Sequence, residues 1–496
     1  MRAIRFVHLI KKAFSWETDM NINAIASIQK YEWEERKMKK KLVSLLMVAT
    51  MAVSMVACGS SAETPAADAT APAADATATA EAPAAAAADE GKVLNFHCWN
   101  TEFQERVVAY YPGYEEVDAT TGKIGDVTVN WVITPSDDNA YQNNLDATFE
   151  KQLSDSLEDD EKIDIFLIEA DYAVKYTGSD ATLALADLGL TDDVFAKQYQ
   201  YTKDVVTFDG KLKGASWQGC PGAMVYRRDI AKEVLGSDDP KDVQAAVANW
   251  DKFLETAGTM SDAGYYMTSS ANDTFRVFSN NVTTKWVDDN KKIVVDDNIK
   301  KWAEMSEEMV ANKQTDTFGL WSDDWNKGFY MDGKVFCYFG PAWLIDFCMA
   351  CDQEGSVGAA GNWGLTEGPQ GFFWGGTWIC AANGTDNPTL VADIIKTMTT
   401  DEAVLTKIIT EKSDFVNSIE INDKFAADET FGNAYLGGQN PYGIFSSGVA
   451  TVDLSNTSAY DQTCNEEFQN AMKEWFDGNY ASYDDALASF YEKVVE

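Results

Sequence analysis

Three short apolar runs, separated by segments with helical spacing, constrain the fold more than any other feature of this chain. The runs lie at residues 93–99, 127–133 and 163–168, and the first two are followed by segments with the apolar period of a helix, 102–111 and 141–157. Strands that alternate with helices in this way form a parallel sheet with helices on its faces. The sequence therefore predicts an α/β fold.

The length of the chain predicts two lobes. The part after residue 91 holds about 405 residues, which exceeds what a single hydrophobic core usually organises. We expect each lobe to contain a mixed sheet flanked by helices.

An export signal is predicted near the N-terminus. Lys39–Lys41 precede an uncharged run from Leu42 to Ala57, which is short for a membrane-spanning helix and ends in front of Cys58 and Gly59. This order is typical of a lipoprotein signal, so we expect Cys58 to be the lipid-bearing first residue of the mature chain. An ordinary membrane anchor is the alternative.

The segments on either side of this signal have no features of a folded domain. Because Met38 directly precedes the lysines, we expect residues 38–57 to be the signal peptide and residues 1–37 to be upstream sequence from a mistaken start codon. Residues 58–91 are rich in Ala, Thr, Pro, Asp and Glu and lack aromatic side chains. Such a segment has little to bury, which predicts a disordered tether spanning roughly 30 Å.

Charge and histidine content exclude several function classes. The chain has 79 acidic and 40 basic residues, a net charge of −39, so nucleic acid and anionic lipid are not expected as partners. Its two histidines are His8, which precedes the signal, and His97, which we expect to pack in a strand. With neither a phosphate-binding loop nor a G-x-S-x-G motif, we expect no catalytic residue, no metal site and no cofactor.

The cysteines do not indicate a disulfide framework. Without Cys58 their number is odd and their spacing irregular, so most are expected to be free and buried. For Cys348 and Cys351, helix packing or one local disulfide is expected.

Polar and aromatic side chains follow two of the predicted strands. Trp99, Asn100 and Glu102 come directly after the first strand, and Glu169 and Asp171 come after the third. Ligands bind at the carboxyl ends of strands in α/β sheets. These residues therefore predict a site for a polar ligand.

A series of landmarks occurs farther along the chain in a familiar order. They are Asp209–Trp217, Ala223–Asp229, Asn249–Leu254, Gly333–Trp343, Gly375–Ala381, Pro388–Ile395, Thr400–Ala403, Leu436–Asn440 and Tyr483–Leu487. In this order they resemble segments of the extracellular solute-binding proteins of ABC importers, carbohydrate type, which include the maltodextrin-binding proteins. Ala342, which interrupts a Gly-Pro-Trp pattern, is a small departure.

The resemblance implies a two-lobed clamshell of the periplasmic-binding-protein type that closes on its ligand by a hinge. The implied lobes are residues 92–217 with 376–430, and residues 218–375 with 431–496. It also implies a monomeric receptor rather than an enzyme, held by the lipid on Cys58 at the extracytoplasmic face of the cell membrane. Its partners would be a carbohydrate, of oligosaccharide length, and the membrane subunits of the importer.

Candidate ligand residues divide into stacking and hydrogen-bonding groups. Indole faces suit the C–H surfaces of sugar rings, and carboxylates and amides suit hydroxyl groups. The stacking candidates are Trp99, Trp217, Trp343, Trp374 and Trp378. The hydrogen-bonding candidates are Asn100, Glu102, Glu169, Asp171 and Gln439. By resemblance, Trp343 is the residue expected to lie under a sugar ring.

Two other functions remain open from the residues alone. Aromatic side chains with carboxylates also bind ammonium groups, which permits a receptor for a polyamine or another small polar solute. A secreted glycoside hydrolase would use two carboxylates across a cleft, and Glu169 and Asp171 are the pair to consider for that chemistry.

Overall fold

The computed structural model describes residues 91–288 and 290–494. Four predictions fall on residues outside these ranges: the upstream segment, the signal peptide, the lipid on Cys58 and nearly all of the tether. Within the described ranges, no helix has both the length and the apolar character needed to cross a membrane.

The first sheet has seven strands in the order β2-β3-β4-β1-β5-β14-β8. The central strand β1 pairs in parallel with β4 and with β5, which confirms the predicted strand–helix alternation. The bounds are β1 (Val93–Cys98), β2 (Tyr114–Glu116), β3 (Thr121–Ile124), β4 (Val127–Ile133), β5 (Ile165–Glu169), β8 (Ala215–Ser216) and β14 (Thr377–Ala381). The antiparallel hairpin β2–β3 was not predicted, because its strands are short and largely exposed.

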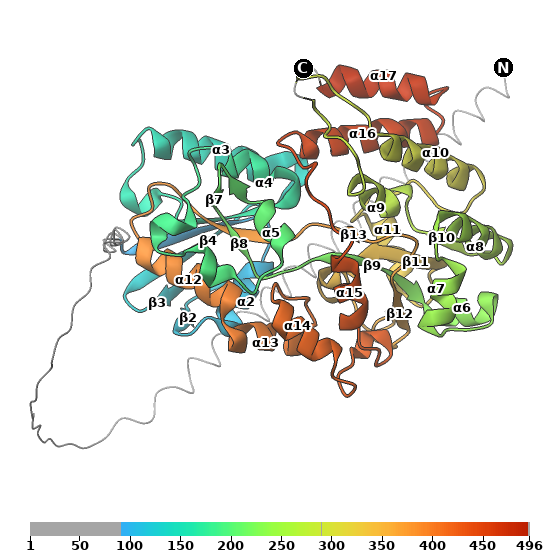
Figure 1. Cartoon of the computed structure of the whole chain (residues 1–496), viewed down its shortest axis with the longest axis horizontal. Coiled ribbons are helices and arrows are strands. Elements are labelled where there is room, and N and C mark those ends of the chain that lie inside the picture. The colour runs from blue at the N-terminus through green and yellow to red at the C-terminus, as the bar shows by residue number, and fades with distance from the viewer. Residues whose placement is uncertain (1–90, 289, 495–496) are drawn as a thin grey trace, which may run out of the picture. The chain divides into compact units, whose positions relative to one another are not determined.

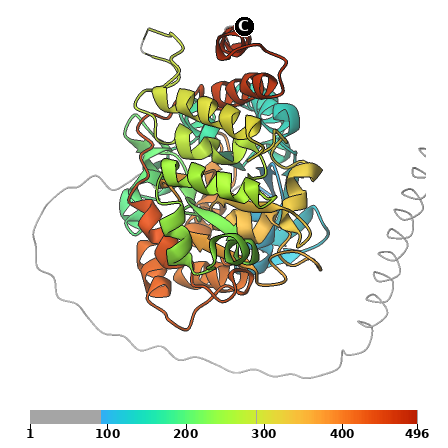
Figure 2. The ribbon, with the colours of Figure 1, turned by 90° about the vertical axis from the view of Figure 1, so that its right-hand side faces the viewer.

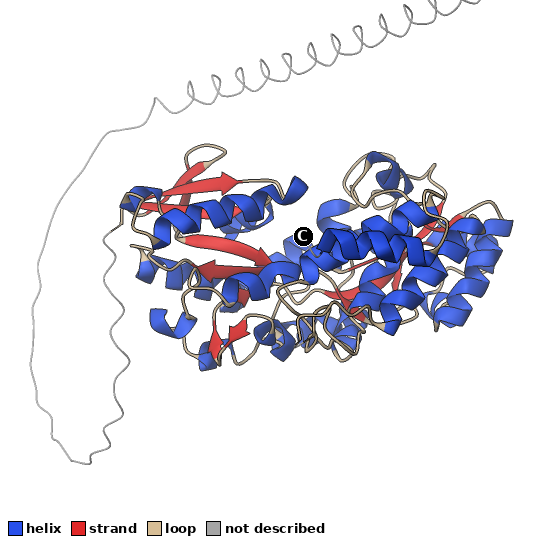
Figure 3. Cartoon of the chain, turned by 90° about the horizontal axis from the view of Figure 1, so that it is seen from above, coloured by secondary structure: helices blue, strands red, loops and turns tan. Residues whose placement is uncertain are grey.

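The second sheet has five strands, with β10-β11-β9-β12 side by side and β13 paired to β9. Their bounds are β9 (Pro221–Arg227), β10 (Tyr266–Thr268), β11 (Val335–Gly340), β12 (Trp363–Thr366) and β13 (Phe372–Phe373), and a separate hairpin joins β6 (Thr207–Phe208) to β7 (Lys211–Leu212). Strand β9 is buried along its whole length, as a central strand with both faces covered should be. Figure 3 shows the strands of the two larger sheets as separate groups with helices around each.

Helices cover both sheets (Figure 1). Those that begin before residue 240 are α2 (Glu102–Tyr110), α3 (Ala140–Leu153), α4 (Ala170–Thr177), α5 (Gln200–Asp204) and α6 (Arg228–Leu235). Those in the middle of the chain are α7 (Pro240–Ala246), α8 (Trp250–Asp262), α9 (Phe275–Ser279), α10 (Asp297–Ala311) and α11 (Asp323–Asn326). Those that follow β14 are α12 (Pro388–Thr400), α13 (Glu402–Lys412), α14 (Ile419–Ala426), α15 (Tyr442–Val449), α16 (Asp461–Phe476) and α17 (Tyr483–Val494).

Short single-turn elements complete the chain. The 3₁₀ turns are η1 (Asp137–Asn139), η2 (Asp159–Glu161), η3 (Leu185–Leu188), η4 (Asp192–Phe195), η5 (Ala271–Thr274), η6 (Lys327–Phe329) and η8 (Ala434–Leu436), and η7 (Leu344–Cys348) is a π-helical turn. Helix α8 begins directly after Asn249, because the Asn249 side chain accepts a hydrogen bond from the Lys252 N–H at 3.0 Å.

Three segments cross between the sheets. Residues 217–220 join β8 to β9, and residues 374–376 join β13 to β14. A third segment follows α13, and its Val416 forms a β-bridge with Gln218 of the first crossing. Figure 1 shows β8 and β9 running from one sheet toward the other. The crossings bring the carboxyl ends of β1 and β5 close to the second sheet.

Apolar side chains pack on both sheets in two clusters. Leu94, Phe96 and Ile165 belong to a cluster that surrounds the first sheet and continues through the crossing segments to the second sheet, where it includes Val225 and Leu365. Phe253, Trp302, Phe468 and Phe490 belong to a second cluster, formed by helices α8, α10, α16 and α17. Helix α16 lies along α10 and α17, as Figure 2 and the contacts among these helices agree.

The structure confirms that the cysteines are mostly free and buried. Every cysteine in the described residues is free, and all except Cys348 are fully buried. Cys348 and Cys351 form no local disulfide. His97 is buried in β1, as predicted.

Candidate ligand-binding site

A cavity of about 430 Å³ lies where the ends of β1 and β5 meet the second sheet. Its volume is typical of small-molecule sites. The lining residues come from both sheets, the crossings and α16; they are Trp99, Asn100, Glu102, Ser136, Gln142, Glu169, Asp171, Tyr172, Gln218, Asn272, Arg276, Leu320, Trp321, Trp343, Phe347, Cys348, Trp374, Gly375, Gly376, Thr377, Gln462, Glu466 and Gln469.

Two strand ends of the first sheet form one wall. After β1, the Asn100 Oδ1 accepts a hydrogen bond from the Glu102 N–H at 3.0 Å, which turns the chain into α2. After β5, the Glu169 Oε2 accepts from the Asp171 N–H at 2.8 Å and caps α4. Negative charge at a helix N-terminus is favourable, so local structure holds the Glu169 carboxylate at the edge of the cavity.

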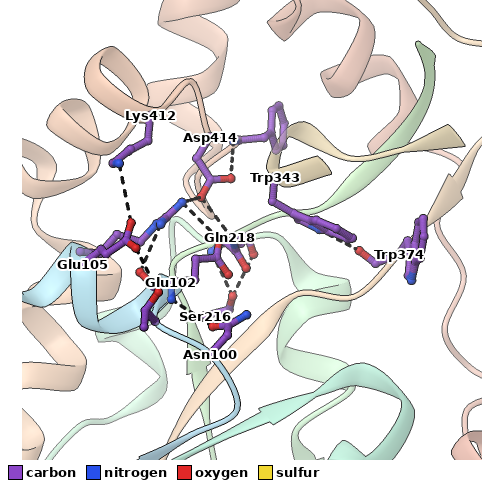
Figure 4. Close-up of polar contacts among 12 residues, drawn as sticks. Asn100, Glu102, Glu105, Ser216, Gln218, Trp343, Trp374, Lys412 and Asp414 are labelled. Carbon is purple, nitrogen blue, oxygen red and sulfur yellow. Dashed lines mark hydrogen bonds and ion pairs between the residues drawn. The ribbon is translucent and has the colours of Figure 1, made fainter. Parts of the chain in front are cut away.

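Three indole rings form the opposite wall. The Trp343 and Trp374 ring centroids are 5.3 Å apart at an interplanar angle of 70°, and Trp321 lies 6.2 Å from Trp343 and 5.7 Å from Trp374. The Trp343 Nε1 donates to the Trp374 carbonyl at 3.3 Å, and Figure 4 shows these two residues side by side. The hydrogen bond fixes the orientation of the Trp343 ring relative to the crossing segment.

Gly375 lets the crossing segment pass close to Trp343. Its φ is +69°, and a Cβ on this residue would lie 3.3 Å from the Trp343 ring. The backbone conformation therefore favours glycine, and a Cβ would press against the Trp343 ring.

Trp321 is the cavity aromatic that the sequence analysis missed. Its side chain is 50% exposed, and its backbone has a φ of +70°, a conformation that few residues other than glycine adopt. Residues held in such conformations cluster at ligand sites. Neither its exposure nor its backbone angle has a sequence signal.

An ion pair connects the two walls. Arg276 on α9 donates to the Asp171 Oδ1 at 2.6 Å through Nη1, and its Nη2 also pairs with Oδ2. Their side chains are 18% and 13% exposed. A two-point geometry of this kind is the strongest form of the interaction between arginine and a carboxylate.

A second polar network lies behind Glu102, where α2 meets the crossings. The Gln218 Nε2 donates to the Glu102 Oε1 at 2.8 Å and to the Asp414 Oδ2 at 3.3 Å. Arg106 lies 3.2 Å from Glu102 and 3.3 Å from Asp414 through the same Nη2 atom. Figure 4 shows that Asp414 and Gln218 link Glu102 to two of the crossing segments.

Burial shifts the protonation of the cavity carboxylates. Burial raises the pKa of Glu169, and the Asp171 charge raises it further, while Arg276 opposes both effects. Burial also raises the pKa of Glu102, with Arg106 as the main opposing charge. Such shifts are typical of functional sites.

Seven of the predicted ligand residues line this cavity, namely Trp99, Asn100, Glu102, Glu169, Asp171, Trp343 and Trp374. Three do not. Trp217 is fully buried and stacks on Phe103 at 5.0 Å, and Trp378 is 1% exposed and donates through Nε1 to the Thr202 carbonyl at 2.7 Å. A ligand cannot reach either ring in this structure, which corrects both predictions.

Gln439 has a structural role instead. Its side chain accepts from Arg228 at 2.9 Å and from the Leu365 N–H at 3.0 Å, and it donates to the Leu365 carbonyl at 2.8 Å. The amide thus completes the edge of the second sheet, and its hydrogen-bonding groups are already used.

The sequence analysis also missed the residues that the second sheet and α16 contribute. Arg276, Asn272, Gln462, Glu466 and Gln469 reach the cavity from segments with no recognisable motif. Gln462 and Glu466 contact Asn139 beside α3, with the Gln462 Nε2 donating to the Asn139 Oδ1 at 2.6 Å. Within the described residues, no group of three or more His, Cys, Asp or Glu side chains is placed to hold a metal ion.

Two α/β lobes joined by crossing segments, with a cavity between their sheets, define the periplasmic-binding-protein-like fold. A profile of the bacterial extracellular solute-binding proteins matches residues 115–428, and the chain belongs to this family. Membership places the protein among extracytoplasmic binding proteins. None of the curated proteins compared with the chain matches it significantly.

Solved structures share the fold at low sequence identity. An extracellular solute-binding protein of family 1 is 18% identical, with a TM-score of 0.64, over 81% of this chain and 99% of its own. An ABC-transporter-associated binding protein from B. animalis subsp. lactis Bl-04, in complex with β-1,6-galactobiose, is 20% identical, with a TM-score of 0.62, over 81% and 96%. The galacto-N-biose/lacto-N-biose I-binding protein of Bifidobacterium longum, in complex with lacto-N-biose, is 13% identical, with a TM-score of 0.59, over 82% and 98%.

Proposed function

We propose that this protein is a lipid-anchored receptor that captures an oligosaccharide between its two lobes and delivers it to the membrane subunits of an ABC importer. The observation that carries the proposal is the cluster of Trp321, Trp343 and Trp374 opposite Glu169 and Asn100. Indole faces pack against sugar rings, and the carboxylate and amide groups hydrogen-bond to hydroxyls. Relatives of the same fold that hold disaccharides support this ligand class.

Closure of the lobes is the step that would signal capture. In this proposal the lobes are residues 92–217 with 376–430 and residues 218–375 with 431–496, and the crossings act as the hinge. A ligand stabilises the closed form only through contacts that the open form lacks. The indole cluster and Glu169 come from different lobes, so a bound sugar that contacts both would supply such contacts.

The lipid anchor belongs to the same proposal. A receptor held through Cys58 by a flexible tether remains near the importer while it samples the surrounding medium. The protein would act as a monomer, because a single pair of lobes forms the whole cavity.

Two observations weigh against a glycoside hydrolase. Asp171 is engaged by Arg276 at two points, which keeps both oxygens of that carboxylate occupied. Glu169 caps α4 with one of its oxygens. A pair of catalytic carboxylates must instead face the scissile bond from two sides. A polyamine ligand is the remaining alternative, because the cavity is rich in carboxylates.

Thermal unfolding of the full chain tests the proposal. The chain is mixed with mono- and oligosaccharides and, separately, with polyamines, and each sugar mixture is checked for cleavage products. A bound sugar at 100 times its dissociation constant adds about 2.7 kcal/mol to the free energy of unfolding. Stabilisation by an intact oligosaccharide supports the receptor. Cleaved sugar would identify an enzyme, and a response only to polyamines would overturn the carbohydrate ligand.

A further inference from the structure

We propose that the cavity selects sugars without carboxylate groups and that Glu169 enforces this selection, an inference that rests on the carbohydrate function proposed above. It concerns the chemical class of sugar, which the fold does not specify.

The ionisable side chains that line the cavity are predominantly acidic. Glu102, Glu169, Asp171 and Glu466 contribute carboxylates, and Arg276 is the one basic side chain among the described lining residues. Both terminal nitrogens of Arg276 are engaged by Asp171. A ligand carboxylate would therefore have to displace Asp171 and leave that charge without a partner in a poorly solvated position.

The Glu169 carboxylate is placed where a stacked sugar would meet it. Its Oε2 caps α4, whereas its Oε1 lies 3.7 Å from the position that a Cβ of Gly375 would occupy. The Trp343 ring lies 3.3 Å from the same position. The free oxygen and the proposed stacking face therefore lie beside one glycine. A ring on Trp343 would present its edge to the Glu169 carboxyl group, whose ionised form attracts hydroxyl or ammonium donors and repels a carboxylate. Because burial raises the pKa of Glu169 to about 8, this repulsion is greatest above that pH.

Gln142 is a second feature that favours a ligand with hydrogen-bond donors. Its side chain lines the same cavity, is only 4% exposed, and its Oε1 has no hydrogen-bond partner. A buried acceptor that lacks a donor is costly, so unpaired acceptors of this kind are rare. The Oε1 atom is itself covered in this structure, so a ligand hydroxyl or amine reaches it only when the Gln142 side chain turns toward the cavity; a carboxylate has no proton to donate.

A glycan array followed by titration of matched pairs tests this inference. The full chain is applied to neutral, amine-bearing and uronic-acid oligosaccharides, and each bound neutral glycan is then compared with the counterpart whose C6 hydroxymethyl group is oxidised to a carboxylate. We expect the oxidised counterpart to bind at least about tenfold more weakly at low salt and about pH 9, where Glu169 is ionised. In Glu169→Gln, which keeps an acceptor for the Asp171 N–H, this ratio should fall to below about threefold.

The controls separate this inference from the function on which it rests. Glu420→Gln removes a carboxylate that is 66% exposed and pairs with Lys197, and it should leave the ratio unchanged. Equal binding of neutral and oxidised glycans would overturn the selection. So would an affinity ratio between the two glycans that Glu169→Gln leaves unaltered, provided that the variant keeps the wild-type melting temperature. Either result would leave the proposed sugar receptor intact. Absence of binding to every glycan would instead reject the proposed function, and this inference with it.

Discussion

Asp171 and Arg276 connect the two lobes through an ion pair in which both carboxylate oxygens are used. Asp171 lies in the first turn of α4, which packs on β5 of the first sheet, and Arg276 lies on α9 beside β13 of the second. The two residues are 105 positions apart in the chain. Because both also line the cavity, the contact that holds the lobes together adjoins the place where a ligand would bind.

Arg276→Gln should weaken this connection. Removal of one partner leaves the mostly buried Asp171 charge unpaired, which we expect to cost about 2–4 kcal/mol of unfolding free energy and to favour a more open arrangement of the lobes. Urea unfolding measures the first effect and small-angle X-ray scattering the second. The matched control is Lys175→Gln, whose pair with Asp146 is 42% and 46% exposed and should contribute below about 1 kcal/mol. Equal effects of the two substitutions would contradict the role of the pair.

Arg106→Met should be among the most destabilising substitutions in the protein. Arg106 is 1% exposed and lies between Glu102 and Asp414, so its loss leaves two buried carboxylates without their cation. We expect a loss of about 3–5 kcal/mol, measured by urea unfolding at pH 7. Lys412→Gln serves as the control, because its nitrogen lies 3.9 Å from Glu105 in a half-exposed pair. A stable Arg106→Met protein would show that packing, and not charge, organises the hinge.

Stability should fall as the pH rises from about 4 to about 7. Burial raises the pKa of Asp273 from 3.8 to about 7 and that of Asp461 to about 7. Over this range the folded state holds protons that the unfolded state has released. Each carboxyl group therefore contributes its full stabilisation below the pKa that it has in the unfolded chain. That stabilisation is lost as the pH rises through the pKa that the group has in the folded protein. Each group contributes at most about 1.4 kcal/mol per pH unit.

Asp273→Asn isolates one of these groups. The slope of unfolding free energy against pH is proportional to the number of protons that the protein releases on unfolding. Asn does not titrate, so between about pH 4 and 7 this number should fall by up to one and the slope should become shallower. Asn keeps one side-chain oxygen, so only one of the two donors to Asp273, the Ser270 N–H at 2.8 Å or the Trp325 Nε1 at 2.7 Å, loses its acceptor. This loss costs about 1 kcal/mol at every pH and does not change that slope. Denaturant titrations at several pH values measure both quantities. An unaltered slope would show that Asp273 is charged throughout this range.

Cys58→Ser tests the predicted lipid anchor. If Cys58 carries the lipid, the substitution should remove the protein from the membrane fraction or leave the signal peptide uncleaved, and the intact mass should lack acyl chains. Mass spectrometry of the wild-type protein supplies the reference. A wild-type mass that includes the uncleaved signal segment and no lipid would favour the ordinary membrane anchor.

The parallel core of the first sheet and one wall of the cavity could be predicted from the sequence. Strands β1 and β5 are short apolar runs bounded by polar residues, and their carboxyl ends must lie at one edge of a parallel sheet. The cavity is therefore lined, as expected, by the residues that follow these two strands: Trp99, Asn100, Glu102, Glu169 and Asp171.

The other wall depends on information that the sequence pattern does not contain. Side chains alternate between faces along a strand, so on β14 Thr377 lines the cavity while the next residue, Trp378, lies in the core. Trp217 follows β8 in a crossing segment, where no periodic pattern sets the direction of a side chain. Arg276 and Glu466 reach the cavity from helices far apart in the chain, which only the tertiary packing of α9 and α16 brings together. The exposure of Trp321 depends on a left-handed backbone conformation for which tryptophan has no preference.

The most direct test of the account is a calorimetric titration of the full chain, and of its Trp343→Ala and Trp217→Phe variants, with the oligosaccharide that stabilises it most. The account predicts that Trp343→Ala lowers the affinity by at least about tenfold, because a stacking face is lost, with little change in melting temperature. Trp217→Phe removes an indole that is buried and whose Nε1 has no hydrogen-bond partner, so it should bind nearly as well as the wild type. Undiminished binding by Trp343→Ala would contradict the account, because the sugar would then lie outside the indole cluster.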